Sequence, residues 1–283
     1  MIKGIIFDVN GTLTNIYTTE SDENLYRTMA NFLDYYGIKI SPSLLKEEYF
    51  SILMRQKNES KEEHAEFDVV SLFQEIIDKY KTTSTPEISA QTCAIAYRAA
   101  GRYKLELYDH VWNTLEKLKD TYQLAIVSDG QKIWAIPEIK SLNLDKFFDI
   151  FIISSEFGFR KPDQRMFNLA LAAMNLKPSE VIYVGNDMYR DIYGGFNANM
   201  KTILYKSNQG EHNFCGAEAD YIIYSFDQLP KAIEFIENKI QNNTTICNWW
   251  TVTKKFTLML LFLKYLITNN KIKITSYIKI VII

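Results

Sequence analysis

Residues 2–14 read IKGIIFDVNGTLT, and this stretch decides how the rest of the chain is interpreted. The apolar residues 2–7 predict a short buried strand, because a brief apolar run that ends in a turn is typical of a strand inside a sheet. The strand ends at Asp8, and the Asn10-Gly11 pair after it is a strong turn signal. The sequence therefore places an acidic side chain directly after a buried strand.

From about residue 106 onward, strand and helix patterns alternate along the chain. We expect strands at 124–127, 150–153, 181–184, 202–204 and 221–223, and helices at 111–119, up to residue 142, and at 166–174, 192–198 and 229–240. Strands that alternate with helices favour a parallel sheet covered on both faces. The predicted fold class is therefore α/β, with the first strand belonging to the same sheet.

Between residues 22 and 103 the apolar residues recur at helical spacing instead. Leu25, Met29 and Leu33 form one such series, and Val69, Leu72 and Ile76 form another. We interpret this block as a helical insertion. The predicted domains are a core of residues 1–14 plus 106–240 and a helical cap of residues 15–105.

Composition sets residues 241–283 apart from the rest. They contain six lysines and no acid, whereas residues 1–240 contain 26 basic and 34 acidic groups. The net charge of −2 argues against a nucleic-acid partner. Three cysteines without a CxxC pattern and an N-terminus that lacks signal-peptide architecture fit a cytoplasmic protein.

The tail of residues 241–283 is not expected to be part of the fold. Its longest apolar run, residues 256–267, includes Lys264 and is too short to span a bilayer. One hypothesis is that the tail is a read-through or frame-shifted end. The alternative is an interfacial membrane anchor, because the tail is both basic and apolar. We favour the first hypothesis, and we expect deletion of the tail to leave an active protein.

Polar side chains follow four of the predicted strands. Asp8 follows the first, Ser128 the second in SDG, Lys161 the third in RKPD, and Asp187 and Asp191 the fourth in GNDMYRD. Parallel α/β sheets bind ligands at the carboxyl ends of their strands. These residues supply what phosphoryl transfer to a carboxylate needs, namely an attacking acid, further acids for a cation, and a lysine and a hydroxyl for phosphate oxygens.

These four segments, in this order, resemble the four motifs of the haloacid dehalogenase-like superfamily. The resemblance covers residues 1–14 and about 106–225, and the helical insertion after the first motif looks like the C1 cap of that superfamily. Each motif alone is weak, whereas four in order after predicted strands are specific. The resemblance implies a Rossmann-like core, a hydrolase activity and a Mg²⁺ cofactor.

The resemblance also implies roles for individual residues. Asp8 would attack phosphorus and form an aspartyl-phosphate, and Thr12 would support its loop. Ser128, the amide of Asp129, and Lys161 would hold the phosphoryl group. The implied metal site consists of Asp8, the backbone carbonyl of Asn10, and Asp187, supported by Asp191.

Asn10 departs from the pattern of the superfamily's phosphatases, which usually have a second aspartate there as general acid and base. An amide can form hydrogen bonds but cannot relay a proton at neutral pH. We therefore expect a slow or substrate-assisted phosphatase. Two other interpretations of Asn10 stay open. The protein binds a phosphorylated ligand without turning it over, or the Asn10-Gly11 pair deamidates and thereby restores an acid.

Two other chemistries of the superfamily are weighed against a phosphatase. A dehalogenase would use Asp8 on carbon without a metal, but the GNDMYRD segment looks like a metal site. A phosphonate-cleaving enzyme would need an amine in the cap, where Lys57 and Lys61 lie in a charged stretch typical of solvated loops. A Mg²⁺- and phosphate-binding regulator is the non-enzyme alternative.

Substrate choice depends on the cap in capped members of this superfamily. Arg55 is our candidate contact to an anionic substrate, although pairing of the cap arginines with cap acids is the interpretation that we prefer. A closed cap favours a small soluble metabolite as the substrate.

Overall fold

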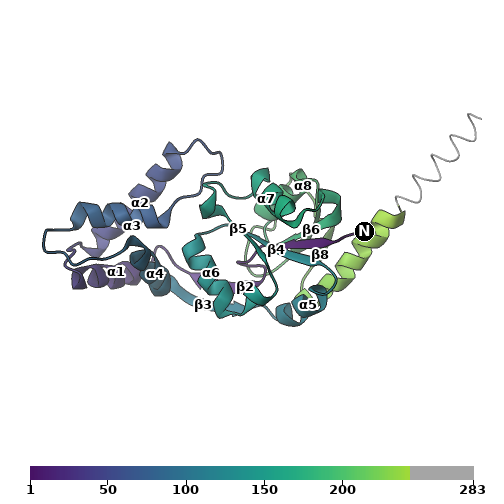
Figure 1. Cartoon of the computed structure of the whole chain (residues 1–283), viewed down its shortest axis with the longest axis horizontal. Coiled ribbons are helices and arrows are strands. Elements are labelled where there is room, and N and C mark those ends of the chain that lie inside the picture. The colour runs from purple at the N-terminus through teal and green to yellow at the C-terminus, as the bar shows by residue number, and fades with distance from the viewer. Residues whose placement is uncertain (243–283) are drawn as a thin grey trace, which may run out of the picture. The chain divides into compact units, whose positions relative to one another are not determined.

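Six parallel strands form the central sheet in this computed structural model, which describes residues 1–242. Their order across the sheet is β5-β4-β1-β6-β7-β8, so the strand that precedes Asp8 lies in the middle (Figure 1). Every neighbouring pair is parallel. The strands are β1 (Gly4–Phe7), β4 (Gln123–Ser128), β5 (Ile150–Ile153), β6 (Val181–Gly185), β7 (Lys201–Tyr205) and β8 (Tyr221–Ile223).

Both faces of the sheet are apolar, and helices cover both of them. Residues Ile6 and Phe7 of β1 are fully buried on opposite sides, as successive residues of a strand must be. Ile6 packs in a cluster with Met166 and Phe167, whereas the Phe7 ring contacts Phe226. The covering helices are α5 (Val111–Leu118), α6 (Lys132–Ser141), α7 (Gln164–Met174), the short α8 (Gly194–Asn197), and the helical residues 229–236. The predicted α/β Rossmann-like fold is confirmed.

Four helices make up the insertion, which we continue to call the cap. They are α1 (Glu23–Tyr35), α2 (Pro42–Glu59), α3 (Val69–Tyr80) and α4 (Ala90–Gly101). A side-chain oxygen caps the first turn of each, from Asp22, Ser41, Asp68 and Ser89 respectively. The helices bury their own aromatic core, so the predicted helical insertion is present, while its exact domain boundaries stay a prediction.

A two-stranded antiparallel ribbon joins the cap to the sheet, and the sequence analysis does not predict it. The strands are β2 (Thr14–Thr18) and β3 (Arg102–Leu107), with Thr14 opposite Leu107. Both strands are short and half-exposed, and β3 carries three charged residues in RYKLEL. They therefore lack the apolar run by which the sheet strands are recognised.

The tail hypotheses concern residues 243–283, which lie outside the described residues. Within residues 1–242, no helix combines the length and the apolar character that crossing a membrane requires.

Candidate active site at the sheet edge

Lys161 is the centre of a buried charge cluster at the carboxyl ends of the strands. Its Nζ lies 2.7 Å from Oδ1 of Asp8, which follows β1, and 2.6 Å from Oδ1 of Asp191, which lies beyond β6. The Lys161 side chain is only 1% exposed. Burial alone would lower the pKa of Lys161, but the facing carboxylates of Asp191 and Asp8 raise it above its ordinary value. The structure thus brings together three residues that are up to 183 positions apart in the chain.

Asp8 is bound on both of its carboxylate oxygens. Lys161 contacts Oδ1, and the Thr12 hydroxyl lies 3.2 Å from Oδ2 and 3.0 Å from Oδ1 of Asn186. Burial raises the pKa of the Asp8 carboxyl to about 6, against the opposing effect of Lys161. Asp8 therefore has the position expected of a nucleophile, in a dry site next to a cation.

The loop after Asp8 is tight, and Asn10 is part of it. The Thr14 hydroxyl donates to Oδ1 of Asn10 across 3.1 Å. Gly11 has φ 87°, and a Cβ there would lie 2.3 Å from Nδ2 of Asn186, so no other residue fits without a shift. The side-chain oxygen of Asn10 thus accepts a hydrogen bond within its own loop, and its NH₂ group can donate hydrogen bonds but cannot release a proton at neutral pH.

Asp191 has protein donors on both carboxylate oxygens. Oδ1 accepts from Lys161 and from the Tyr183 hydroxyl, which is 3.0 Å away. Oδ2 accepts from the backbone amides of Asn186 and Asp187 at 3.1 and 3.0 Å. This arrangement makes Asp191 a support for the loop after β6 and for Lys161, and its predicted place in the metal site stays a prediction.

Asp187 caps a π-helical turn, Met188–Tyr193, so the helical segment begins four residues before the predicted helix at 192–198. Its Oδ1 accepts from the amides of Tyr189 and Arg190, and its Oδ2 accepts from the guanidinium of Arg190 at 3.0 Å and from the amide of Glu211. Burial would raise the pKa of Asp187, but the amide and charge of Arg190 lower it overall. The carboxylate of Asp187 is therefore ionised, and it already accepts four hydrogen bonds.

The segment after β4 approaches the cluster from the other side. Ser128 is buried, and Oδ1 of Asp129 accepts from the backbone amide of Lys161 at 2.9 Å. Oδ2 of Asp129 is buried and has no hydrogen-bond partner among residues 1–242, and the guanidinium groups of Arg160 and Arg190 lie 3.5 and 3.9 Å from it. A buried carboxylate oxygen without a hydrogen bond is unusual in a folded protein.

The oxygen atoms at this edge of the sheet are of the kind that bind a hard divalent cation. The carboxylates and the amide and carbonyl oxygens around Asp8, Asn10 and Asp187 are the ligands that Mg²⁺ prefers. Within residues 1–242, no three acidic, histidine or cysteine side chains form a metal cluster of their own. This is compatible with Mg²⁺, which takes only one or two protein carboxylates and completes its shell with water and substrate oxygens.

Arg55 lies on the cap and pairs there with Glu75 of α3, with both side chains over 40% exposed. Other cap arginines reach the core instead. Arg98 makes a bidentate pair with Glu138 of α6, and Arg102 joins it at 3.1 Å. The preferred interpretation, pairing of the cap arginines with cap acids, is confirmed for Arg55 and wrong for Arg98 and Arg102, whose partner Glu138 belongs to the core. The substrate contact of Arg55 stays a prediction.

The family profile described as haloacid dehalogenase-like hydrolase matches residues 5–205. The chain belongs to this family. The match includes the cluster around Lys161 and the whole cap, and the chain is therefore a hydrolase of the haloacid dehalogenase type.

Among curated relatives, this family member is similar to archaeal enzymes named glyceraldehyde 3-phosphate phosphatase. That of Methanocaldococcus jannaschii is 29% identical over 84% of this chain and 98% of its own length, and that of Methanothermobacter thermautotrophicus is 30% identical over 78% and 91%. That of Pyrococcus furiosus is 38% identical, but the match spans 44% of this chain and about half, 52%, of that protein.

Solved structures of this fold include different hydrolases of the family. A phosphatase from Thermococcus onnurineus matches with TM-score 0.55 and 22% identity over 82% of this chain and 98% of its own. A 2-haloacid dehalogenase from Pseudomonas syringae matches with TM-score 0.60 and 20% identity over 83% and 99%. The fold by itself therefore does not choose between the two chemistries.

Sequence reasoning missed several residues of the site. Tyr183 and Asn186 contact Lys161 and Thr12, and a cap residue, Glu66, contacts Ser154 beside the segment after β4. Tyr183 and Asn186 adjoin the fourth motif, which is a signal that could have found them. Glu66 lies in a charged stretch of the cap and has no such signal.

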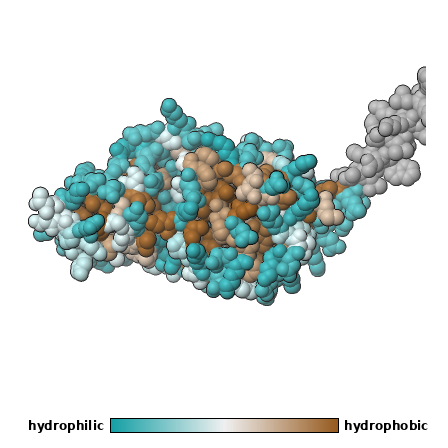
Figure 2. Space-filling view, in the orientation of Figure 1, coloured by the Kyte–Doolittle hydropathy of each residue, from teal (hydrophilic) through white to brown (hydrophobic). Residues whose placement is uncertain are grey.

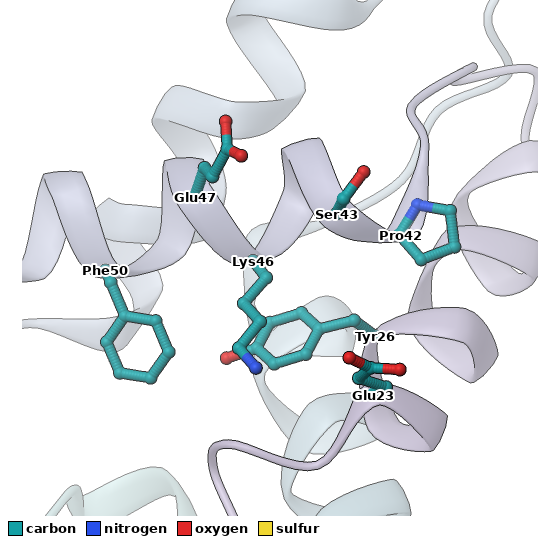
Figure 3. A pocket seen from close by; sticks show the side chains of 7 residues that line it. All are labelled: Glu23, Tyr26, Pro42, Ser43, Lys46, Glu47 and Phe50. Atoms are coloured by element: carbon teal, nitrogen blue, oxygen red, sulfur yellow. The ribbon is translucent and has the colours of Figure 1, made fainter.

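The cap also has a groove of about 670 Å³ between α1 and α2. Figure 3 shows Tyr26 and Glu23 of α1 facing Lys46 and Phe50 of α2 across it. Lys46 spans the groove and donates to the carbonyl of Ser21 at 2.7 Å. None of the residues that line the groove belongs to the predicted site, so the groove is a feature of the cap alone.

Proposed function

We propose that the protein hydrolyses the phosphate ester of a small metabolite through an aspartyl-phosphate on Asp8. The contact of Lys161 with Asp8 at 2.7 Å carries this proposal, because it sets a fixed cation beside the attacking oxygen and the phosphate it would meet. The similarity to curated phosphatases over most of the chain supports the same chemistry.

In the first step, an oxygen of Asp8 forms a bond to phosphorus while the bond from phosphorus to the ester oxygen breaks. Lys161 and Ser128 bind the phosphoryl oxygens as charge shifts toward the leaving group. In the second step, water attacks phosphorus, and Asp8 and inorganic phosphate are released. Both steps use side chains that the fold already holds at the sheet edge.

The proposed site lacks a general acid and base at position 10. The leaving alkoxide needs a proton, and the attacking water must lose one, but Asn10 can only form a hydrogen bond. General acid–base catalysis is typically worth about 10²–10⁴-fold in rate. We therefore propose a slow phosphatase in which protons exchange with solvent or with the substrate.

Mg²⁺ is the proposed cofactor, held by Asp8, the carbonyl of Asn10 and Asp187, with Asp191 in support. When bound, it would neutralise charge on the phosphoryl group. Asp129 adds a further carboxylate to the same edge, and its Oδ2 faces Arg160 and Arg190 at 3.5 and 3.9 Å.

Glyceraldehyde 3-phosphate is the first substrate to test, because several curated relatives are named for it. We propose a small soluble substrate of this kind, a cytoplasmic location for the protein, and no nucleic-acid partner. The interior of the cap is packed with aliphatic and aromatic side chains, so we propose that residues at the boundary with the sheet make the polar contacts to the substrate.

Dehalogenation is the second candidate function. A halide leaves without a proton, so a site that lacks a general acid at position 10 suits a carbon–halogen bond as well. The likeness to the fold of a 2-haloacid dehalogenase is consistent with this alternative. Phosphate binding without turnover, as in a regulator, is the third.

A substrate panel separates these candidates. Phosphate release would be measured with glyceraldehyde 3-phosphate and other sugar, nucleotide and acid phosphates, with Mg²⁺ or with EDTA, and halide release with 2-haloacids. We expect slow phosphate release that requires Mg²⁺ and is lost in Asp8→Asn. Phosphate release no faster than in Asp8→Asn would refute the phosphatase, and metal-independent halide release would establish the alternative.

A further inference from the structure

The cap segment between α2 and α3, residues 60–68, lies against the core loops next to the active site. The amide of Glu66 donates to the carbonyl of Gly158 at 2.9 Å, and the amide of Arg160 donates to the carbonyl of His64 at the same distance. These two bonds flank a bridge between Ala65 and Phe159. The segment is therefore docked by backbone pairing to the loop that leads to Lys161.

Glu66 extends this docking to the segment after β4 through side chains. Its Oε2 accepts from the Ser154 hydroxyl at 2.7 Å, and Ser154 Oγ accepts from the backbone amide of Gly130 at 2.8 Å. Glu66 is 8% exposed and Ser154 is fully buried. Two consecutive hydrogen bonds thus run from a cap carboxylate to a residue two positions beyond Ser128.

Gln131 ties the same loop to the cap a second time. Its Nε2 donates to the carbonyl of Phe67 at 2.7 Å, and its Oε1 accepts from the amide of Val69 at 3.1 Å. Gln131 is 3% exposed. The loop of residues 128–131 is therefore held at its far end by the cap and at Asp129 by the amide of Lys161.

Burial of the Glu66 carboxylate costs more free energy than a contact with only a structural role would need. Within residues 1–242, no salt bridge to Glu66 is present, and its hydrogen bonds come from neutral donors, Ser154 and the amide of Phe67. Burying a carboxylate without a cation costs free energy that neutral hydrogen bonds offset only in part. Nearby Glu62 instead pairs with Arg165 at the surface, where both are about a third to a half exposed.

We propose that Glu66 is a positioning residue for phosphate binding. Its negative charge strengthens the hydrogen bond from Ser154, and Ser154 in turn fixes the amide of Gly130, so that the loop of residues 128–131 is held ready for the phosphoryl group. Phosphate affinity thereby depends on a cap residue that does not touch the phosphate. This inference rests on the proposed function of Ser128 and Asp129.

The test compares Glu66→Ala, Glu66→Gln and Ser154→Ala in the full chain with Mg²⁺ present. Calorimetry measures the Kd of inorganic phosphate, and kinetics measure KM and kcat for the best ester of the panel. We expect Kd and KM to rise about tenfold in both alanine variants, the effect of losing one charge-assisted hydrogen bond, with kcat within about threefold. Glu66→Gln keeps an acceptor for Ser154 but not the negative charge, so it should recover only part of the affinity and fall between the wild type and Glu66→Ala.

Two comparisons separate positioning from simple stability. The double variant Glu66→Ala/Ser154→Ala should bind phosphate no more weakly than either single variant, because both interrupt the same path. Glu62→Ala, which removes an exposed contact between the same segment and the core, should leave Kd and KM unchanged.

Wild-type affinity in Glu66→Ala, or equal weakening in Glu62→Ala, would overturn the inference. So would a Glu66→Gln variant as weak as Glu66→Ala. A wild-type protein that binds phosphate but does not turn over esters would refute the proposed phosphatase while still testing Glu66. Absence of phosphate binding in the wild type would refute both.

Discussion

Two regions of the protein pair lysine or arginine with acids, and they do so in opposite settings. At the sheet edge, Lys161 lies between Asp8 and Asp191, and all three side chains are at most 8% exposed. On the cap, Arg55 pairs with Glu75 while each side chain is more than 40% exposed. On the face of residues 1–242 that Figure 2 shows, hydrophilic residues lie mainly around the edge and hydrophobic residues gather toward the middle.

The difference shows that residue type alone does not reveal which charges take part in chemistry. An exposed ion pair is screened by water and is typically worth about 0–1 kcal/mol. A buried charge is screened far less, and removing its partner costs several kcal/mol. The buried cluster of Lys161, Asp8 and Asp191 is therefore the stronger candidate for chemistry, whereas the exposed pair of Arg55 and Glu75 contributes little energy.

Asn10→Asp gives the largest expected effect, because it adds the missing proton relay to the buried region. Turnover of the best phosphate ester should rise by about 10²–10⁴-fold, which corresponds to about 3–5 kcal/mol in the barrier. Steady-state phosphate release with Mg²⁺ measures it, and the Asp8→Asn/Asn10→Asp double variant should be inactive. An unchanged rate in Asn10→Asp would mean that this position does not limit catalysis.

Lys161→Met removes the cation from the buried cluster and leaves two carboxylates facing each other. We expect the free energy of unfolding to fall by about 3–5 kcal/mol, measured by urea denaturation. Lys132→Met is the matched control, because Lys132 forms an exposed pair with Glu156 and should change stability by less than about 0.5 kcal/mol. Equal losses in the two variants would break the distinction between the regions.

Two buried tyrosines test hydrogen bonding in the core and the cap at a smaller scale. Tyr183→Phe removes a hydroxyl that bonds to Lys161 and Asp191, and should cost about 1 kcal/mol of stability by urea denaturation. The Tyr49 hydroxyl in the cap core is buried without a hydrogen bond within residues 1–242, so Tyr49→Phe should be neutral or stabilising. A larger loss of stability in Tyr49→Phe than in Tyr183→Phe would contradict the conclusion that the Tyr49 hydroxyl forms no hydrogen bond within residues 1–242.

Arg55→Ala has the smallest expected effect. Its exposed pair with Glu75 predicts a stability change below about 0.5 kcal/mol and a KM within about threefold of the wild-type value. Thermal unfolding and steady-state kinetics with the best ester measure both. A tenfold rise in KM would instead show that Arg55 contacts the substrate, as the sequence analysis suggested.

Much of the fold could be predicted because its signals are local. The apolar runs of β1, β5 and β6 and the helical periodicity of α1 and α3 follow from neighbouring residues, and the structure confirms them. The ribbon of β2 and β3 could not be predicted in this way. Its strands are half-exposed and are stabilised by pairing with each other across more than 80 residues of chain.

The sequence by itself determined the family, the nucleophile candidate and the absence of an acid at position 10, because ordered motifs after strands are read along the chain. Only the tertiary structure decided that Lys161 contacts both Asp8 and Asp191, that four donors surround Asp187, and that Glu66 reaches the loop after β4. These contacts join residues that lie far apart in the chain or on opposite sides of a turn. Their partners and their burial exist only once the sheet has brought its strand ends to one edge.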